Sequence, residues 1–177
     1  RSTLFPYTTL FRSALAEMTP DLYDFEKMKA RFSRYLIEKG MRKTTERFMI
    51  LDHICRIQGH FDVEMLHKQL DDDHFHVSRA SIYNTIETLM DAHIVIRHQF
   101  TAQLVQYELH DAAATHHHAI CSYCGAVKEI KDERLSDGVS RLRTPRFTYE
   151  YHSLYLYGIC SKCKFRIAHR SKKSVAT

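Results

Sequence analysis

Two pairs of cysteines with identical spacing constrain this chain more than any other feature. Cys121 and Cys124 form the first CxxC pair, and Cys160 and Cys163 form the second. Four thiolates in two such pairs match the coordination of a tetrahedral zinc ion. Because four thiolates leave no open position for water or substrate, we expect a structural rather than a catalytic zinc. The fold must then bring two distant stretches of chain together.

The fifth cysteine, Cys55, stands apart from these pairs. It follows Leu51 by four residues on an expected helix, which favours a thiol buried in the core. No convincing secretory signal is present, so we expect a cytoplasmic protein whose paired cysteines bind metal and do not form disulfides.

Length and composition limit the class of protein and its partners. A chain of 177 residues, 44% of them apolar, can form one ordinary domain or two small ones. No apolar run approaches the ~18 residues of a membrane span, so we expect no membrane partner. The formal net charge is +5, and the positive excess lies after residue 110. Nucleic-acid binding by the first half must therefore rest on local clusters of charge.

Residues 1–17 are expected to be a non-native or disordered extension, because no helical or strand period in them continues into the chain. They resemble translated sequencing-adapter sequence, and Met18 is a plausible true start. The alternative is a short apolar targeting segment, which Pro6 and Arg12 would interrupt.

Apolar residues at spacings of three and four predict a series of helices after Met18. Two of them are expected over 21–39 and 78–91, with Gly40 ending the first. Two more are expected between these, and Asp62 is the predicted N-cap of the later one.

A β-hairpin is expected to follow, with strands over 94–99 and 103–109 and a tip at 100–102. Helices followed by a hairpin are typical of a winged helix-turn-helix domain, here 18–109, whose recognition helix would be 78–91. The outward positions expected on that helix are Ser78, Arg79, Ser81, Tyr83, Asn84 and Thr85. These side chains suit contacts to phosphates and base edges, and a merely solvated polar face is an equal alternative. A basic cluster near the second helix, Arg42, Lys43 and Arg47, suits phosphate binding.

A hinge of small residues at 110–115 separates this domain from a second, small α/β unit over 116–170. Strands at 118–120 and 126–130 are expected to flank the first cysteine pair. A helix over 132–142 and one or two strands over 147–159 would follow, and a basic tail would occupy 171–177. Such a small unit has a modest core, so a structural metal would supply much of its folding free energy.

Three consecutive histidines precede the first cysteine pair. On a strand, His116 and His118 point to one face and His117 to the other. Two imidazoles on one face suit Fe²⁺ or Zn²⁺, and oxygen ligands from Glu108 and Glu129 would extend the set. His60, between two helices of the first domain, would complete it. A solvated polar loop is the alternative interpretation of the triplet.

These motifs together resemble the ferric uptake regulator family of metal-dependent bacterial repressors. The likeness runs from about residue 25 to residue 165 with its motifs in order. The stretches that carry it are 40–47, 60–62, 78–85, 107–109, 116–125 and 151–158. The family implies an α+β protein, with a winged helix-turn-helix domain followed by a small α/β dimerisation domain that holds a four-cysteine zinc site.

The resemblance also implies roles for individual residues. It implies structural Zn²⁺ at the four paired cysteines and a regulatory ion, Fe²⁺ or else Zn²⁺ or Mn²⁺, at a second site. The implied regulatory ligands are His60, Glu108, His116, His118 and Glu129. Glu108 matches only if the hinge carries one extra residue, and otherwise His110 takes its place. Tyr83 and its neighbours would enter the major groove of a double-stranded DNA operator, Arg42 would reach the minor groove, and the protein would be a homodimer.

The chain departs from the family at a third metal site. His117 and His152 match two of its ligands, but Thr115 stands where some relatives have a further histidine, and the acidic ligand has no clear match. The peroxide-sensing branch of the family has Asp at the two acidic regulatory positions, which here are Glu108 and Glu129. This difference favours an iron-responsive repressor, with a zinc- or peroxide-responsive member of the family as the alternative.

Two other classes of function remain as alternatives. A constitutive DNA-binding module with structural zinc alone would bind DNA without a response to metal. A zinc metallohydrolase would need an open metal site beside a general base, and the sequence has no HExxH pattern. We therefore expect neither an enzyme nor a small-molecule substrate.

Overall fold

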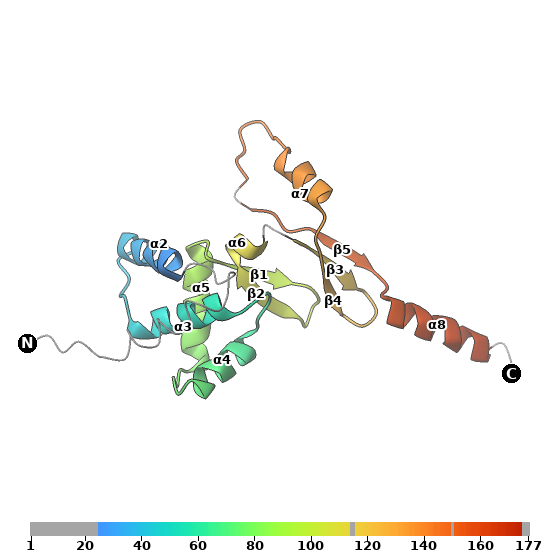
Figure 1. Ribbon diagram of the computed structural model, residues 1–177, viewed down its shortest axis with the longest axis horizontal. Helices are drawn as coiled ribbons and strands as arrows, with labels where there is room; N and C mark the ends of the chain where they lie inside the picture. Colours follow the sequence, from blue (N-terminus) through green and yellow to red (C-terminus); the bar gives the residue numbers. More distant parts are fainter. Residues whose placement is uncertain (1–24, 114–115, 150, 175–177) are drawn as a thin grey trace, which may run out of the picture.

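The computed structural model describes residues 25–113, 116–149 and 151–174, which form two units side by side (Figure 1). The first unit, called the helical unit below, contains α2 (Phe25–Glu38), α3 (Thr45–Arg56), α4 (Val63–Asp72), α5 (Arg79–Asp91), β1 (Val95–Gln99) and β2 (Val105–Leu109). The second, called the sheet unit, contains β3 (His117–Cys121), β4 (Val127–Ile130), α7 (Glu133–Ser140), β5 (Tyr155–Gly158) and α8 (Ser161–Ser174). A short helix, α6 (His110–Ala113), follows the hairpin.

Side-chain caps begin three helices of the first unit, including the predicted cap Asp62. Thr44, Asp62 and Ser78 each accept a hydrogen bond from the backbone N–H three residues later, at the starts of α3, α4 and α5. Gly40 ends α2 with a φ of 64°, a conformation that glycine adopts without strain. The expected helix over 21–39 is confirmed from Phe25 onward, and its first four positions lie outside the described residues.

The core of the helical unit is formed by the inner faces of α2 to α5, and it includes Phe32, Leu51, Leu66 and Ile82. Cys55 is buried among them, and burial raises the pKa of its thiol to about 12. The expectation of an inert core thiol is therefore confirmed.

One outward position expected on α5 is wrong. Thr85 is only 3% exposed. It lies three residues after Ile82 and four before Leu89, both in the core, so the helical period turns it inward.

The hairpin of β1 and β2 is antiparallel, with Ile96 opposite Glu108. Its tip is longer than the expected 100–102, because Phe100 already turns inward and its N–H donates to the carbonyl of Leu104. A bridge on the outer edge of β2 joins Phe61 to Tyr107 through two backbone hydrogen bonds of 2.7 and 2.8 Å. This bridge fixes the segment before α4 alongside the hairpin.

The sheet unit is built on three strands in the order β4-β3-β5, with β3 antiparallel to β4 and parallel to β5. The expected strands around the first cysteine pair and the helix α7 are present. Of the expected strands over 147–159, only β5 forms in the described residues, because 151–154 has no regular pairing.

Two expectations about connecting segments need correction. Residues 110–113 of the expected hinge form α6, and 114–115 lie outside the described residues. Residues 171–174 of the expected basic tail belong to the helix α8, which extends away from the rest of the chain (Figure 1). Among the described helices, none is both long enough and apolar enough to cross a membrane.

Candidate metal centres and DNA-binding surface

The four paired cysteines meet at one end of the sheet unit. Their four sulfur atoms all lie within 4.8 Å of one another. The Sγ atoms of Cys124 and Cys160 are 3.8 Å apart, and the N–H of Cys160 donates to the Sγ of Cys121 at 3.3 Å. A tetrahedral zinc ion with Zn–S bonds of ~2.3 Å has sulfur–sulfur edges of about 3.8 Å. The cluster therefore fits a structural zinc ion.

The protonation of these thiols also favours a cation. Hydrogen bonds from the backbone N–H groups of Cys160 and Cys124 lower the pKa of Cys121 to about 6. Burial, followed by the neighbouring sulfurs, raises the pKa of Cys163 to about 12. All four thiolates can therefore coexist near neutral pH only with a compensating positive charge, which a divalent metal supplies.

A second cluster lies between the two units, and strand register places each of its members. The bridge of Phe61 to Tyr107 sets His60 beside Glu108, the next residue of β2. In the sheet unit, His118 is directly opposite Glu129 on β4 and beside Tyr155 on β5, so these side chains share one face. Side chains that are distant in sequence thus converge from both units.

Four side chains of this cluster are close enough to share one ion. Ligand atoms of His60, Glu108, His116 and His118 all lie within 4.8 Å of one another. The Nε2 atoms of His60 and His116 are each 3.3 Å from Glu108 Oε2, and the Nε2 atoms of His60 and His118 are 2.8 Å apart. Glu108 Oε2 is buried and accepts no hydrogen bond from the described residues. Three imidazoles around such an oxygen fit a divalent cation.

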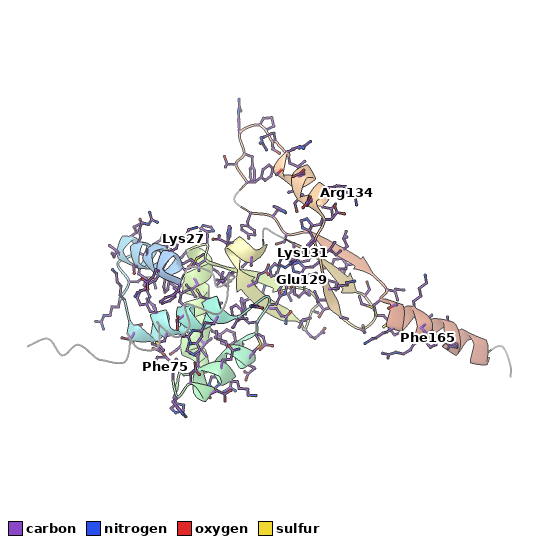
Figure 2. All side chains as sticks on the ribbon, viewed as in Figure 1. Lys27, Phe75, Glu129, Lys131, Arg134 and Phe165 are labelled. Atoms are coloured by element: carbon purple, nitrogen blue, oxygen red, sulfur yellow. The ribbon has the colours of Figure 1, made fainter. Side chains whose placement is uncertain are left out.

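The fifth expected ligand, Glu129, lies at the margin of this group. Its Oε1 is 3.8 Å from His60 Nδ1 and 4.0 Å from His116 Nε2, and its side chain is 42% exposed. Figure 2 shows Glu129 in the sheet unit, near the hairpin of the helical unit. Glu108, and not the alternative His110, faces the cluster, since His110 instead contacts Asp111 and Tyr151.

Burial and neighbouring groups shift the pKa values of His60, His118 and Glu108 below their ordinary values. Burial, then the neighbouring imidazoles of His60 and His98, lowers the pKa of His118 to about 4. The pKa of His60 is also lowered, mainly by burial. Burial alone would raise the pKa of Glu108, but the hydrogen bond from His98 and the nearby imidazoles outweigh it and lower the pKa. At neutral pH His60 and His118 are therefore neutral imidazoles and Glu108 is a carboxylate, the forms that bind metal.

Sequence reasoning missed two aromatic residues around this cluster. His98 is 1% exposed and bonds to Glu108, and Phe100 packs against the rings of His60, His98 and His118. Strand alternation offered a signal for His98, because it lies two residues after the inward-facing Ile96. Nothing in the sequence indicated that Phe100 turns back into the cluster.

His117 points to the opposite face of β3, as the alternation of a strand predicts. Its ring centroid is 5.8 Å from that of His152, and its Nε2 is 3.5 Å from Ser136 Oγ. His117 Nδ1 and His152 Nε2 are both buried without a hydrogen bond among the described residues. The structure thus brings the two histidines of the expected third site together, with a serine beside them.

Most of the expected DNA-contacting residues surround one groove in the helical unit. The groove between the start of α3 and the face of α5 is lined by Arg42, Arg47, Ser81, Asn84 and Thr85, among others. Tyr83 is 48% exposed beside it. Arg79 instead makes a bidentate ion pair with Glu64, with both N···O distances 2.7 Å.

Helices and a hairpin followed by a sheet unit, with one group of potential metal ligands between the units and four clustered cysteines beyond it, fit a class of metal-responsive transcription regulators. The model of the Ferric uptake regulator family matches residues 38–157. This chain therefore belongs to the ferric uptake regulator family, whose members regulate transcription and are not enzymes.

Individual relatives agree with this assignment. The ferric uptake regulation protein of Vibrio anguillarum is 33% identical over 148 residues, 78% of this chain and 95% of that protein. The corresponding protein of Neisseria meningitidis is 31% identical over 133 residues, 73% of this chain and 90% of that protein. The ferric uptake regulator of Pseudomonas aeruginosa, solved with manganese, superposes with a TM-score of 0.62 at 27% identity, covering 73% of this chain and 97% of that one.

Proposed function

We propose that this protein is a metal-activated DNA-binding repressor, most simply an iron-responsive one, in which the regulatory ion sets the angle between the two units. The observation that supports this most is the origin of the second cluster. His60 and Glu108 belong to the helical unit. His118 lies on β3 of the sheet unit, and His116 directly precedes this strand. An ion held by all four binds the closed arrangement better than any arrangement that separates them.

In this proposal the helical unit corresponds to a DNA-binding domain over 18–109, and the sheet unit to a dimerisation domain over 116–170. Tyr83, Asn84 and Ser81 on α5 would contact the major groove, and Arg42 would contact the backbone or the minor groove. Arg79 would reach DNA only by exchanging Glu64 for a phosphate. Thr85, being buried, would help to position α5 rather than touch bases.

A homodimer would use the apolar surface of the sheet unit. Large apolar side chains are exposed along its loop, edge strand and last helix: Leu142, Phe147, Tyr149, Tyr151, Leu156, Tyr157, Ile159, Phe165 and Ile167. Figure 2 shows Phe165 on α8, away from the helical unit. Exposed apolar side chains gathered in one unit suit an interaction site. In such a dimer the angle between units sets the spacing of the two α5 helices, which must match successive major grooves about 34 Å apart.

The imidazole and carboxylate ligands of the second cluster suit several divalent ions. The identity of the regulatory ion is therefore tested by experiment. DNA fragments would be selected from a random pool with protein loaded with Fe²⁺ under anaerobic conditions, with Zn²⁺ or with Mn²⁺. The proposal expects tight, sequence-selective DNA binding with at least one of these ions, and a weaker response without it. The ion that activates at the lowest free concentration is the assigned effector.

The variant His118→Ala tests the role of the cluster. It should lose metal-dependent DNA binding while it keeps one structural zinc per chain and the folded structure. His76→Ala is the matched control, because its side chain is 78% exposed in the loop before α5, and it should behave as wild type. DNA binding that stays equally sensitive to metal in His118→Ala would refute the proposal in favour of a constitutive DNA-binding module.

A further inference from the structure

His98 occupies a position between the two units that the ligand set does not explain. It lies on β1 with its side chain turned inward, and both of its ring nitrogens are bonded. His98 Nε2 is 2.9 Å from Glu108 Oε1, and His98 Nδ1 is 2.7 Å from the hydroxyl oxygen of Tyr155. Tyr155 belongs to β5 in the sheet unit, whereas His98 and Glu108 belong to the hairpin of the helical unit. A chain of two hydrogen bonds therefore crosses from one unit to the other.

The chemistry of the three groups sets the direction of these bonds. A carboxylate only accepts hydrogen bonds, so His98 Nε2 must donate to Glu108. A hydroxyl can both donate and accept, and it donates to His98 Nδ1 when the ring carries its proton on Nε2 alone. All three groups are buried or partly buried, so water does not readily replace a lost partner.

The two carboxylate oxygens of Glu108 have different partners. Oε1 is held by His98, and this leaves Oε2 directed at His60 and His116, 3.3 Å from the Nε2 atom of each. His98 itself is not a member of the four-residue group whose ligand atoms lie within 4.8 Å of one another. It is therefore placed to orient a ligand and not to be one.

We infer that Tyr155 and His98 are positioning residues that orient Glu108 for the regulatory ion and tie this orientation to the closed arrangement of the two units. Because Tyr155 lies on the sheet unit, opening of the units breaks its hydrogen bond to His98 and frees the Glu108 carboxylate to rotate. The bond requires no metal, so it biases the metal-free protein toward the geometry that the ion needs. This inference rests on the proposed function of the second cluster.

Titration with Co²⁺ tests the inference, because Co²⁺ reports both affinity and ligand geometry through its visible absorption. The protein carries its structural zinc and an emptied regulatory site. Tyr155→Phe removes one hydroxyl and should weaken Co²⁺ binding about tenfold, and His98→Leu should weaken it by up to about a hundredfold. Both variants should also change the shape of the visible bands, which a general loss of stability would not do.

Two further variants serve as controls. His98→Gln keeps a donor for Glu108 and should bind Co²⁺ more tightly than His98→Leu. Tyr123→Phe makes the same change in the same unit, at an exposed position outside the apolar surface proposed for the dimer, and should match wild type. Wild-type affinity and bands in both Tyr155→Phe and His98→Leu would overturn the inference. If His118→Ala still loses Co²⁺ in that case, the proposed function stands; if His118→Ala also binds normally, both fail.

Discussion

The two metal clusters differ in how their ligands are distributed over the fold. The four cysteines all lie in the sheet unit, on the knuckle after β3 and around the start of α8. The His60–Glu108–His116–His118 group draws on both units. A site contained in one unit can stabilise that unit, but it does not report how two units are arranged. A site shared between units gains or loses ligands when the arrangement changes, and this is the requirement for a switch.

The two clusters also differ in the chemistry of their ligand atoms. Four thiolates form a closed, tightly held site with no open position. Imidazole and carboxylate donors bind several divalent ions less tightly, so the ion exchanges and its binding can follow its concentration. The following changes test this contrast.

The largest effect is expected from Cys121→Ser. Structural zinc contributes of the order of 10 kcal/mol to small zinc domains, which is comparable to the whole stability of a domain. The variant should lose its tightly bound zinc, and the sheet unit should unfold. Zinc analysis and melting followed by circular dichroism measure this. Cys55→Ala, which removes the one cysteine outside the cluster, should keep the zinc, and an unchanged melting profile in Cys121→Ser would argue against a structural ion.

Glu108→Gln should damage the second cluster alone. Removing one charge from a buried, paired group costs about 3 kcal/mol, which corresponds to a roughly hundredfold loss of affinity for the regulatory ion. Glutamine has nearly the same shape and can still accept the hydrogen bond from His98, so the fold and the structural zinc should persist. Isothermal titration with Mn²⁺ measures the affinity. Loss of the structural zinc in this variant would show that the two clusters are not independent.

Acid should destabilise the protein whose regulatory site is empty. The pKa of His118 is about 4 in the folded protein, below its ordinary value of 6.5, so the unfolded chain binds more protons between these values. Stability should therefore be constant above pH 6.5 and fall as the pH drops toward 4. The melting temperature, recorded with zinc retention in the same samples, should fall by a few degrees between pH 7.5 and pH 5. His118→Gln should reduce this slope, and an equal slope in that variant would assign it to other groups.

The smallest effect is expected from Glu129→Gln. This carboxylate is 42% exposed and lies 3.8 and 4.0 Å from the two nearest imidazoles, so water already screens its charge. Affinity for the regulatory ion should fall by less than about tenfold, well below the loss in Glu108→Gln. A loss as large as that of Glu108→Gln would mean that the side chain moves inward when the ion binds.

The sequence predicted candidate ligands best where they are close together along the chain. The two CxxC pairs predicted the four cysteines that the fold brings together, because this spacing is typical of zinc sites. Strand alternation separated His117 from His116 and His118, as the structure has them. It was less informative on the helix, where Thr85 was expected outside, since a polar residue at an inward position leaves the hydrophobic period ambiguous. It did not indicate that residues 161–174 form α8, because six of the fourteen residues there are Lys or Arg and few are apolar.

The sequence by itself therefore indicated the family, the helices of the first unit and the four cysteines that fit a structural zinc ion, all of which depend on local spacing and on side-chain chemistry. Only the tertiary structure decided that His60 meets His118, that Glu129 stands at the margin, and that His98 links Tyr155 to Glu108. These contacts depend on strand register and on the docking of two units, which bring His60 close to Glu129, 69 positions later. The spacing of residues along the sequence does not predict such contacts.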